Sequence, residues 1–117
     1  MAQFGEDIIG TSAQPPFFKV ANADDVGIIA PKNRIGDADR TWVRSISGFQ
    51  KEALVRSAKT GDTWRFVSDE GPYLNGHDAA CCPLAFLSCG MVASFMNEIM
   101  ALAEQQGVEI RKLKLIQ

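Results

Sequence analysis

The side chains best suited to chemistry are three cysteines and the chain's one histidine. Cys81 and Cys82 are adjacent and directly precede Pro83. In a helix that begins at Pro83, Cys82 occupies the N-cap, where free backbone amides and the positive helix end favour a thiolate. His77 and Asp78 lie in the loop just before and could act as a base and its orienting group. We therefore predict a thiol site at the helix start, with Cys82, Cys81, His77 and Asp78 as catalytic candidates.

Other interpretations of these residues stay open. Cysteine also behaves as a small apolar residue, so Cys81, Cys82 and Cys89, which follows two helical turns later, can be packing residues with His77 in solvent. His77, Cys81 and Cys82 could instead supply zinc ligands, but adjacent cysteines rarely both reach a tetrahedral ion. We therefore expect no metal. Since the sequence contains no phosphate-binding loop or dinucleotide fingerprint, we expect no cofactor either.

The segment after the cysteines predicts one long helix from Pro83 to Gln106. Proline suits the first helical position, and Gly107 stands where a left-handed cap is expected. The first four turns are apolar on nearly every side, so a sheet or another subunit must cover them. A pocket rich in Met and Phe would suit a small apolar organic molecule. The substrate-binding candidates are Phe86, Cys89, Met91, Ser94 and, in the preceding loop, Tyr73.

Three β-strands are predicted between Thr41 and the loop GPYLNGHDAA. The runs TWVRSIS, EALVRSA and TWRFVS are rich in Trp, Val, Ile and Phe, and glycine-containing turns separate them. The last two runs, joined by KTGD, predict a hairpin. Trp64 and Phe66 should share one of its faces, and Arg65 and Val67 the other.

The two ends of the chain complete the predicted fold. Residues 1–40 hold short apolar runs, Phe17–Phe18 and Val26–Ile29, broken by proline and glycine without a helical period. We interpret them as an ordered, extended arm that docks on another surface. The final VEIRKLKLIQ alternates as an amphipathic strand does. The predicted class is α+β: an N-terminal arm (1–40), then a half-domain (41–117) with antiparallel strands, one long buried central helix and a C-terminal strand.

The composition limits which partners and which location we expect for the protein. The chain has 117 residues, of which 46% are hydrophobic, and 12 basic against 14 acidic residues give a net charge of −2. This balance argues against nucleic acid or an anionic membrane as the main partner. We expect no signal sequence and no segment that reaches the roughly eighteen apolar residues of a membrane span. Three cysteines make no disulfide framework, so we expect free thiols and a cytoplasmic location.

The start and end of the predicted helix carry a pattern formed by Pro83, Leu84, Leu87, Ala103 and Gly107, which Ile110, Leu113 and Leu115 continue. With three strands and a glycine-rich loop before it, this arrangement resembles the first half of the OsmC/Ohr superfamily. The resemblance covers about residues 42 to 117. It implies an OsmC-like fold built around the central helix.

Two departures from the family change the expected function. The resemblance places the family's attacking cysteine at position 94, which here is Ser94. A hydroxyl lacks the oxidation ladder of sulfur, so peroxide reduction is not expected at that position. Family members also continue beyond the strand into a second cysteine-bearing half. The resemblance therefore implies that a second OsmC-like chain, or a homo-oligomeric partner, supplies that half.

Three functions follow as hypotheses. In the first, the chain is an OsmC-like subunit of a hetero-oligomeric, cofactor-independent enzyme that acts on a small hydrophobic organic compound with thiol chemistry at the helix start. In the second, it is a non-catalytic partner of a catalytic OsmC-like subunit. In the third, it is a thiol-dependent organic hydroperoxide reductase that uses Cys82 and Cys89.

Overall fold

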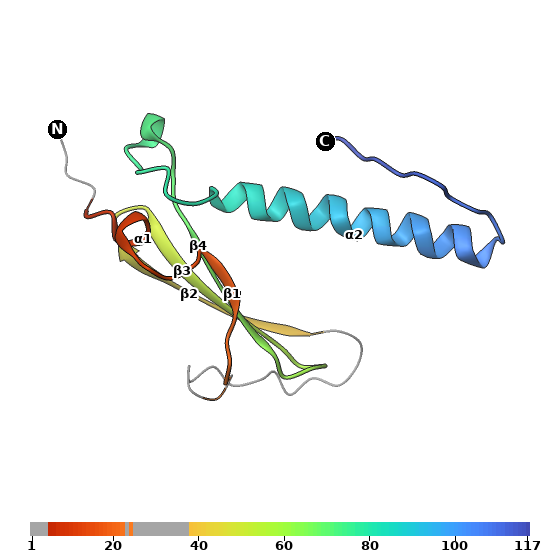
Figure 1. Ribbon diagram of the computed structural model, residues 1–117, viewed down its shortest axis with the longest axis horizontal. Helices are drawn as coiled ribbons and strands as arrows, with labels where there is room; N and C mark the ends of the chain where they lie inside the picture. Colours follow the sequence, from red (N-terminus) through yellow and green to blue (C-terminus); the bar gives the residue numbers. More distant parts are fainter. Residues whose placement is uncertain (1–4, 23, 25–37) are drawn as a thin grey trace. The chain divides into compact units, whose positions relative to one another are not determined.

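The computed structural model describes residues 5–22, 24 and 38–117, and its contacts divide the chain into two units, residues 1–82 and 83–117. The first unit holds a four-stranded antiparallel sheet and the second holds one long helix (Figure 1). The predicted α+β class is therefore confirmed at this level.

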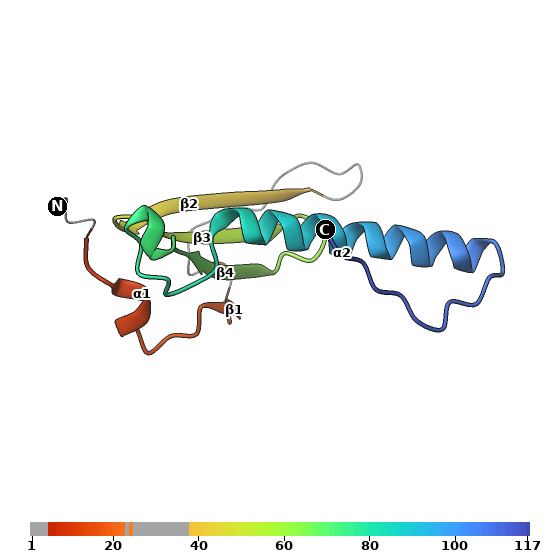
Figure 2. The same ribbon diagram turned by 90° about the horizontal axis from the view of Figure 1, so that it is seen from above.

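The sheet has the strand order β1-β4-β3-β2, and all neighbouring strands are antiparallel. The strands span Phe17–Lys19 (β1), Asp39–Ser47 (β2), Gln50–Ser57 (β3) and Thr63–Ser68 (β4). Strands β2, β3 and β4 follow one another through short turns, as Figure 2 shows. Gly48 and Gly61 lie in these turns with positive φ angles of 51° and 75°, which glycine adopts without strain. The hairpin predicted around KTGD is confirmed.

The strand register sorts side chains onto two faces of the sheet, because successive residues of a strand point to opposite sides. The face that we call the cavity face carries a row of Phe18, Arg65, Leu54 and Trp42, one from each strand. The opposite face, the aromatic face, carries the row Phe17, Phe66, Ala53 and Val43, with Trp64 beside it. Trp64 and Phe66 thus share one face and Arg65 and Val67 the other, as predicted.

The N-terminal segment is partly built into this sheet. A four-residue helix α1, Ile8–Thr11, is capped by the Asp7 side chain, which accepts a hydrogen bond from the Gly10 amide at 2.8 Å. Further on, β1 pairs with β4, and the Phe17 ring stacks on Trp64 with centroids 5.3 Å apart. The Phe17–Phe18 run of the predicted arm therefore lies on the sheet of its own chain. The other run, Val26–Ile29, lies outside the described residues.

Helix α2 spans Pro83–Gln105, which confirms the predicted long helix within one residue. Gly107 has φ 67°, its amide donates to the Glu104 carbonyl at 3.1 Å, and the Val108 amide donates to the Ala103 carbonyl at 2.8 Å. This pair of hydrogen bonds is a Schellman motif, which ends a helix at a left-handed glycine. Proline at one end and glycine at the other therefore set the length of α2.

The predicted burial of α2 by a sheet or by another subunit stays a prediction. The sequence predicts a buried central helix, but no residue of α2 is buried in the single chain. Among the described residues, the buried apolar side chains are Ala53 and Val67 alone. Six large apolar side chains on α2 keep more than half of their surface in water, at Leu84, Leu87, Met91, Phe95, Met100 and Leu102. Others are half-buried, at Phe86, Val92, Met96 and Ile99.

The length and composition of α2 correct the prediction that no segment is long and apolar enough to cross a membrane. It has 23 residues and a mean hydropathy of 1.5 in its most apolar window, so it is long and apolar enough to cross a membrane. The core helix of a water-soluble protein passes the same test, so this property alone assigns no location.

The predicted C-terminal strand is wrong for the single chain, since residues 108–117 form no strand. Their alternating pattern suits a half-buried strand, but a strand also needs a neighbour whose backbone groups complete its hydrogen bonds. No described strand of this chain pairs with these residues.

Candidate functional site

The loop between β4 and α2, residues 69–82, carries the predicted catalytic residues and is organised by the buried carboxylate of Asp69. Asp69 Oδ2 accepts hydrogen bonds from the His77 and Ala79 amides, both at 3.2 Å, and Oδ1 accepts one from the Glu70 amide at 2.8 Å. The Asp69 amide in turn donates to the Cys81 carbonyl at 3.2 Å. One fully buried aspartate thus fixes both the middle and the end of this loop.

Gln50, the first residue of β3, links that aspartate to the N-terminal helix. Its Nε2 donates to Asp69 Oδ2 at 3.0 Å and to Asp7 Oδ1 at 2.7 Å. Its Oε1 accepts from the amides of Ile8 and Ile9 at 2.8 and 3.0 Å. The fully buried Gln50 side chain therefore joins three separate segments of the chain through four hydrogen bonds.

Both carboxylates in this network have lowered pKa values. Burial alone would raise the pKa of Asp69, but the hydrogen bonds from Gln50 and from three backbone amides outweigh it and lower the pKa below the ordinary 3.8. For Asp7, the Gln50 hydrogen bond is the main cause of the lowered pKa, followed by the bond from the Gly10 amide. The network therefore stabilises the ionised form of both carboxylates.

We expect acid to destabilise the sheet unit through Asp69. Because its folded pKa lies below its unfolded value, its contribution is complete above the unfolded pKa and is lost as the pH falls through the folded one. Urea unfolding followed by tryptophan fluorescence should therefore show stability falling below about pH 4. Asp69→Asn should flatten that fall, whereas Asp62→Asn, which removes a partly exposed ion pair with Lys19, should leave it unchanged. An unchanged slope in Asp69→Asn would contradict this role.

The turn inside the loop needs particular backbone conformations. Asn75 and Asp78 have positive φ angles of 61° and 54°, a region that asparagine and aspartate tolerate better than most residues. A side chain at Gly76 would overlap with the backbone of Glu70. The Asp78 amide donates to the Glu70 carbonyl at 3.0 Å, which closes the turn. The loop is thus a specific structure and presents its residues in fixed positions.

The structure brings His77 and Asp78 together in this loop but does not join them to the thiols. His77 Nε2 lies 3.2 Å from the Gly5 carbonyl oxygen, and in the described part of the chain neither His77 nor Asp78 hydrogen-bonds to a cysteine. Cys82 is half-buried and directly precedes the first residue of α2, and Cys81 is exposed in the loop. Cys82 therefore lies at the helix start, where its role as the reactive thiol stays a prediction, whereas His77 contacts the Gly5 carbonyl instead of a cysteine.

The predicted substrate-binding residues lie on exposed surface. Tyr73, in the short 3-10 helix Pro72–Leu74, keeps 76% of its surface in water. Cys89, Met91 and Ser94 are exposed on α2, and Phe86 is half-buried. Their role in binding a substrate stays a prediction. Across the described ranges, no three His, Cys, Asp or Glu side chains gather closely enough to hold a metal ion, so the zinc interpretation of His77, Cys81 and Cys82 gains no support.

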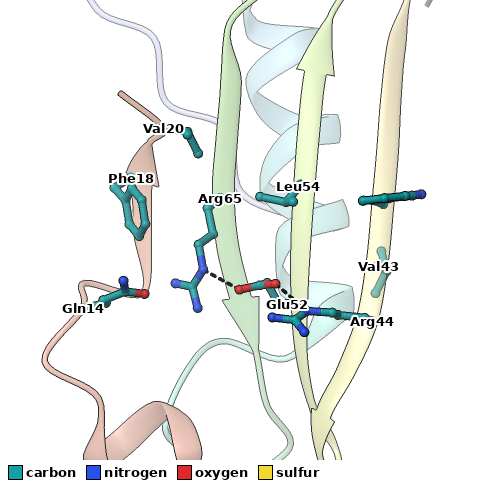
Figure 3. Close-up of a pocket in the computed structure, with 9 residues that line it drawn as sticks. Gln14, Phe18, Val20, Val43, Arg44, Glu52, Leu54 and Arg65 are labelled. Carbon is teal, nitrogen blue, oxygen red and sulfur yellow. Dashed lines mark hydrogen bonds and ion pairs between the residues drawn. The ribbon is translucent and has the colours of Figure 1, made fainter. Parts of the chain in front are cut away.

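A cavity on the cavity face of the sheet is a feature that the sequence interpretation missed. It has a volume of about 640 Å³ and is open to solvent (Figure 3). At its floor the Glu52 carboxylate lies between two guanidinium groups, with 2.7 Å from Arg44 Nε to Glu52 Oε1 and 2.7 Å from Arg65 Nε to Glu52 Oε2. The signal in the sequence was alternation: Trp42 and Arg44, like Glu52 and Leu54, are two residues apart and so face the same side.

The charge state of Glu52 follows from these neighbours. Burial would raise the pKa of Glu52, but the hydrogen bonds and positive charges of Arg44 and Arg65 outweigh it and lower the pKa. Glu52 is therefore ionised at neutral pH, and both arginines are always charged. The three side chains together carry one net positive charge at the floor of the cavity.

Comparisons of the chain with protein-family models, with curated proteins and with solved structures give no match. The resemblance to the OsmC/Ohr superfamily therefore rests on the sequence pattern and stays a prediction.

Proposed function

We propose that this chain is an OsmC-like subunit of a cytoplasmic oligomeric enzyme, in which a second OsmC-like chain or a second copy of this one covers helix α2. The observation that carries the proposal is the size of the core: in the described part of the chain, Ala53 and Val67 are the buried apolar side chains. Stable domains pack at least two layers around one core. A core of this size and an apolar helix without a buried residue therefore call for a further layer.

Within this assembly the proposed chemistry is that of a thiol acting on a small hydrophobic organic compound without a bound cofactor. Cys82 supports this assignment because it directly precedes α2, where the first backbone amides of a helix have no partner within the helix and can donate to a reacting group. The Asp69 amide supports it as well, since it donates to the Cys81 carbonyl and so holds the backbone next to Cys82.

One observation favours a second candidate, a non-catalytic partner of a catalytic OsmC-like subunit. His77, the expected base, contacts the Gly5 carbonyl and no cysteine in the described part of the chain. In this alternative the three thiols pack or lie in solvent, and the companion chain carries the reactive cysteine.

Thiol labelling of single-cysteine variants under native conditions tests both parts of the proposal. Cover by another chain should make Cys89, in the second turn of α2, react with a bulky maleimide at least about tenfold more slowly than in urea. Cys82 should instead react with iodoacetamide about tenfold faster than a thiol in the unfolded chain. Cys81, the exposed cysteine of the loop and itself a catalytic candidate, is labelled in the same way, and each variant unfolded in urea is its own control.

The outcomes separate the candidates. Labelling of Cys89 at its unfolded rate would show that α2 is uncovered, which contradicts the assembly. A protected Cys89 with an unreactive Cys82 would overturn the thiol role and favour the non-catalytic partner. Loss of two free thiols from the wild-type chain on treatment with cumene hydroperoxide would instead support the reductase that uses Cys82 and Cys89.

A further inference from the structure

The cavity on the cavity face is lined by residues of the sheet unit alone. Every side chain that lines the cavity belongs to residues 5–82. Its volume of about 640 Å³ lies within the range of small-molecule sites. The chemistry of its lining therefore indicates what kind of molecule it accepts.

The polar end of the cavity has unused hydrogen-bond donors. Arg44 and Arg65 each reach Glu52 through Nε alone, and each guanidinium has four further N–H groups on its two Nη atoms. Throughout the described residues, no hydrogen bond or ion pair joins these Nη atoms to the protein. With one carboxylate already between two cations, the remaining donors and the net positive charge favour a single added anionic group.

The geometry of Arg65 is fixed before any ligand arrives. Its side chain is 15% exposed, its Nε is held by Glu52, and its guanidinium carbon lies 5.4 Å from the centre of the Phe18 ring. A cation over an aromatic face is attracted to it, which restrains the planar group further. Figure 3 shows Arg65 and Arg44 reaching Glu52 from opposite sides, so the two guanidinium groups lie on either side of the Glu52 carboxylate.

The rest of the cavity is apolar. Trp42 keeps 56% of its surface exposed, and its row on the sheet also contains Leu54 and Phe18, with Val20 next to them. An exposed tryptophan beside aliphatic side chains favours contact with an apolar body. A ligand that satisfies both ends has an anionic head and a hydrocarbon or aromatic body.

We propose that this cavity binds amphipathic monocarboxylates, with the carboxylate between the Nη groups of Arg44 and Arg65 and the apolar body along Trp42 and Leu54. A carboxylate matches the planar donor fork of arginine, which gives two parallel hydrogen bonds. This site goes beyond the proposed enzyme function and does not rest on it.

Calorimetric titration of the purified chain with sodium octanoate tests the site, with acetate as the head group alone and 1-octanol as the body alone. We expect octanoate to bind at least about tenfold more tightly than either, and added salt to weaken binding because the contact is charged. Arg44→Gln should weaken the binding of octanoate at least about tenfold. Arg44 is mostly exposed, so this change leaves the Arg65–Glu52 pair in place.

The matched control is Arg111→Gln, which removes the same charge from a well-exposed arginine outside the cavity and should bind octanoate as the wild type does. Trp42→Ser provides a second variant and should also weaken octanoate, with circular dichroism confirming the fold. Equal binding by Arg44→Gln and Arg111→Gln, or 1-octanol binding as tightly as octanoate, would overturn the proposal. Because these titrations need neither a partner nor turnover, their failure is distinguishable from failure of the proposed function.

Discussion

Replacing Gln50 by alanine should lower the free energy of unfolding by about 2–4 kcal/mol. The change removes four hydrogen bonds from a fully buried position, leaves the Ile9 amide without its acceptor and leaves the Ile8 amide with the Glu6 carbonyl alone. It also takes from the buried Asp69 carboxylate its one side-chain donor. A buried charge that loses a hydrogen-bond partner destabilises the folded state more than a neutral group does. Substitution of Gln50 should therefore give one of the largest losses of stability in the chain.

Urea denaturation at one fixed protein concentration measures this loss, because stability of an oligomer depends on concentration. Gln14→Ala is the matched control: it is the same substitution at an exposed residue and should change stability by less than about 0.5 kcal/mol. Gln50→Glu should be at least as harmful as Gln50→Ala near pH 7, since it places a third carboxylate beside Asp7 and Asp69. A loss below about 1 kcal/mol in Gln50→Ala would show that the network does not hold the unit together.

Replacing Phe95 by lysine should dissociate the proposed assembly. Phe95 lies in the middle of α2 with 62% of its surface exposed, on a helix that has no buried residue. If another chain covers it, the change removes a large apolar contact and buries a charge. A cost of about 3–4 kcal/mol raises the dissociation constant by two to three orders of magnitude.

Sedimentation velocity across a dilution series measures this effect. Gln105→Lys introduces the same charge at the last residue of α2, beyond its apolar turns, and should sediment as the wild type does. Circular dichroism should show the helix retained in both variants. Identical sedimentation of Phe95→Lys and wild type would mean that no partner covers this part of the helix.

The elements with local signals could be predicted from the sequence. Proline at position 83 and glycine at position 107 set the bounds of α2 within a residue, because both act through the backbone of the helix ends. The turn KTGD and the alternation around it gave the β3–β4 hairpin and assigned Trp64 and Arg65 to opposite faces. Each of these features depends on residues close together in the chain.

Features that depend on distant partners could not be predicted. Gln50 bonds to Asp7, Asp69 and the start of α1 across separations of 19 to 43 residues, and a single glutamine leaves no periodic signal. Strand β1 has three residues, too few to show alternation, and its place in the sheet depends on pairing with β4. The C-terminal segment shows the opposite case, because Leu113 and Leu115 alternate correctly but no described strand pairs with them.

The sheet unit and the helix unit differ in how they are held. The sheet unit is fixed by the Gln50 and Asp69 network, by the Glu52 ion pairs and by four paired strands. The helix unit has no buried residue on α2 and exposes six large apolar side chains along it. By this account the first unit carries the specific sites, and the second carries the surface that another polypeptide covers.

Sedimentation equilibrium of the purified wild-type chain in detergent-free buffer tests that central claim most directly. One chain has a mass of 12.8 kDa, and we expect a particle heavier than this at every loading concentration, because the apolar surface of α2 is unstable in water. A compact particle of 12.8 kDa that stays monomeric over the whole concentration range would contradict the account.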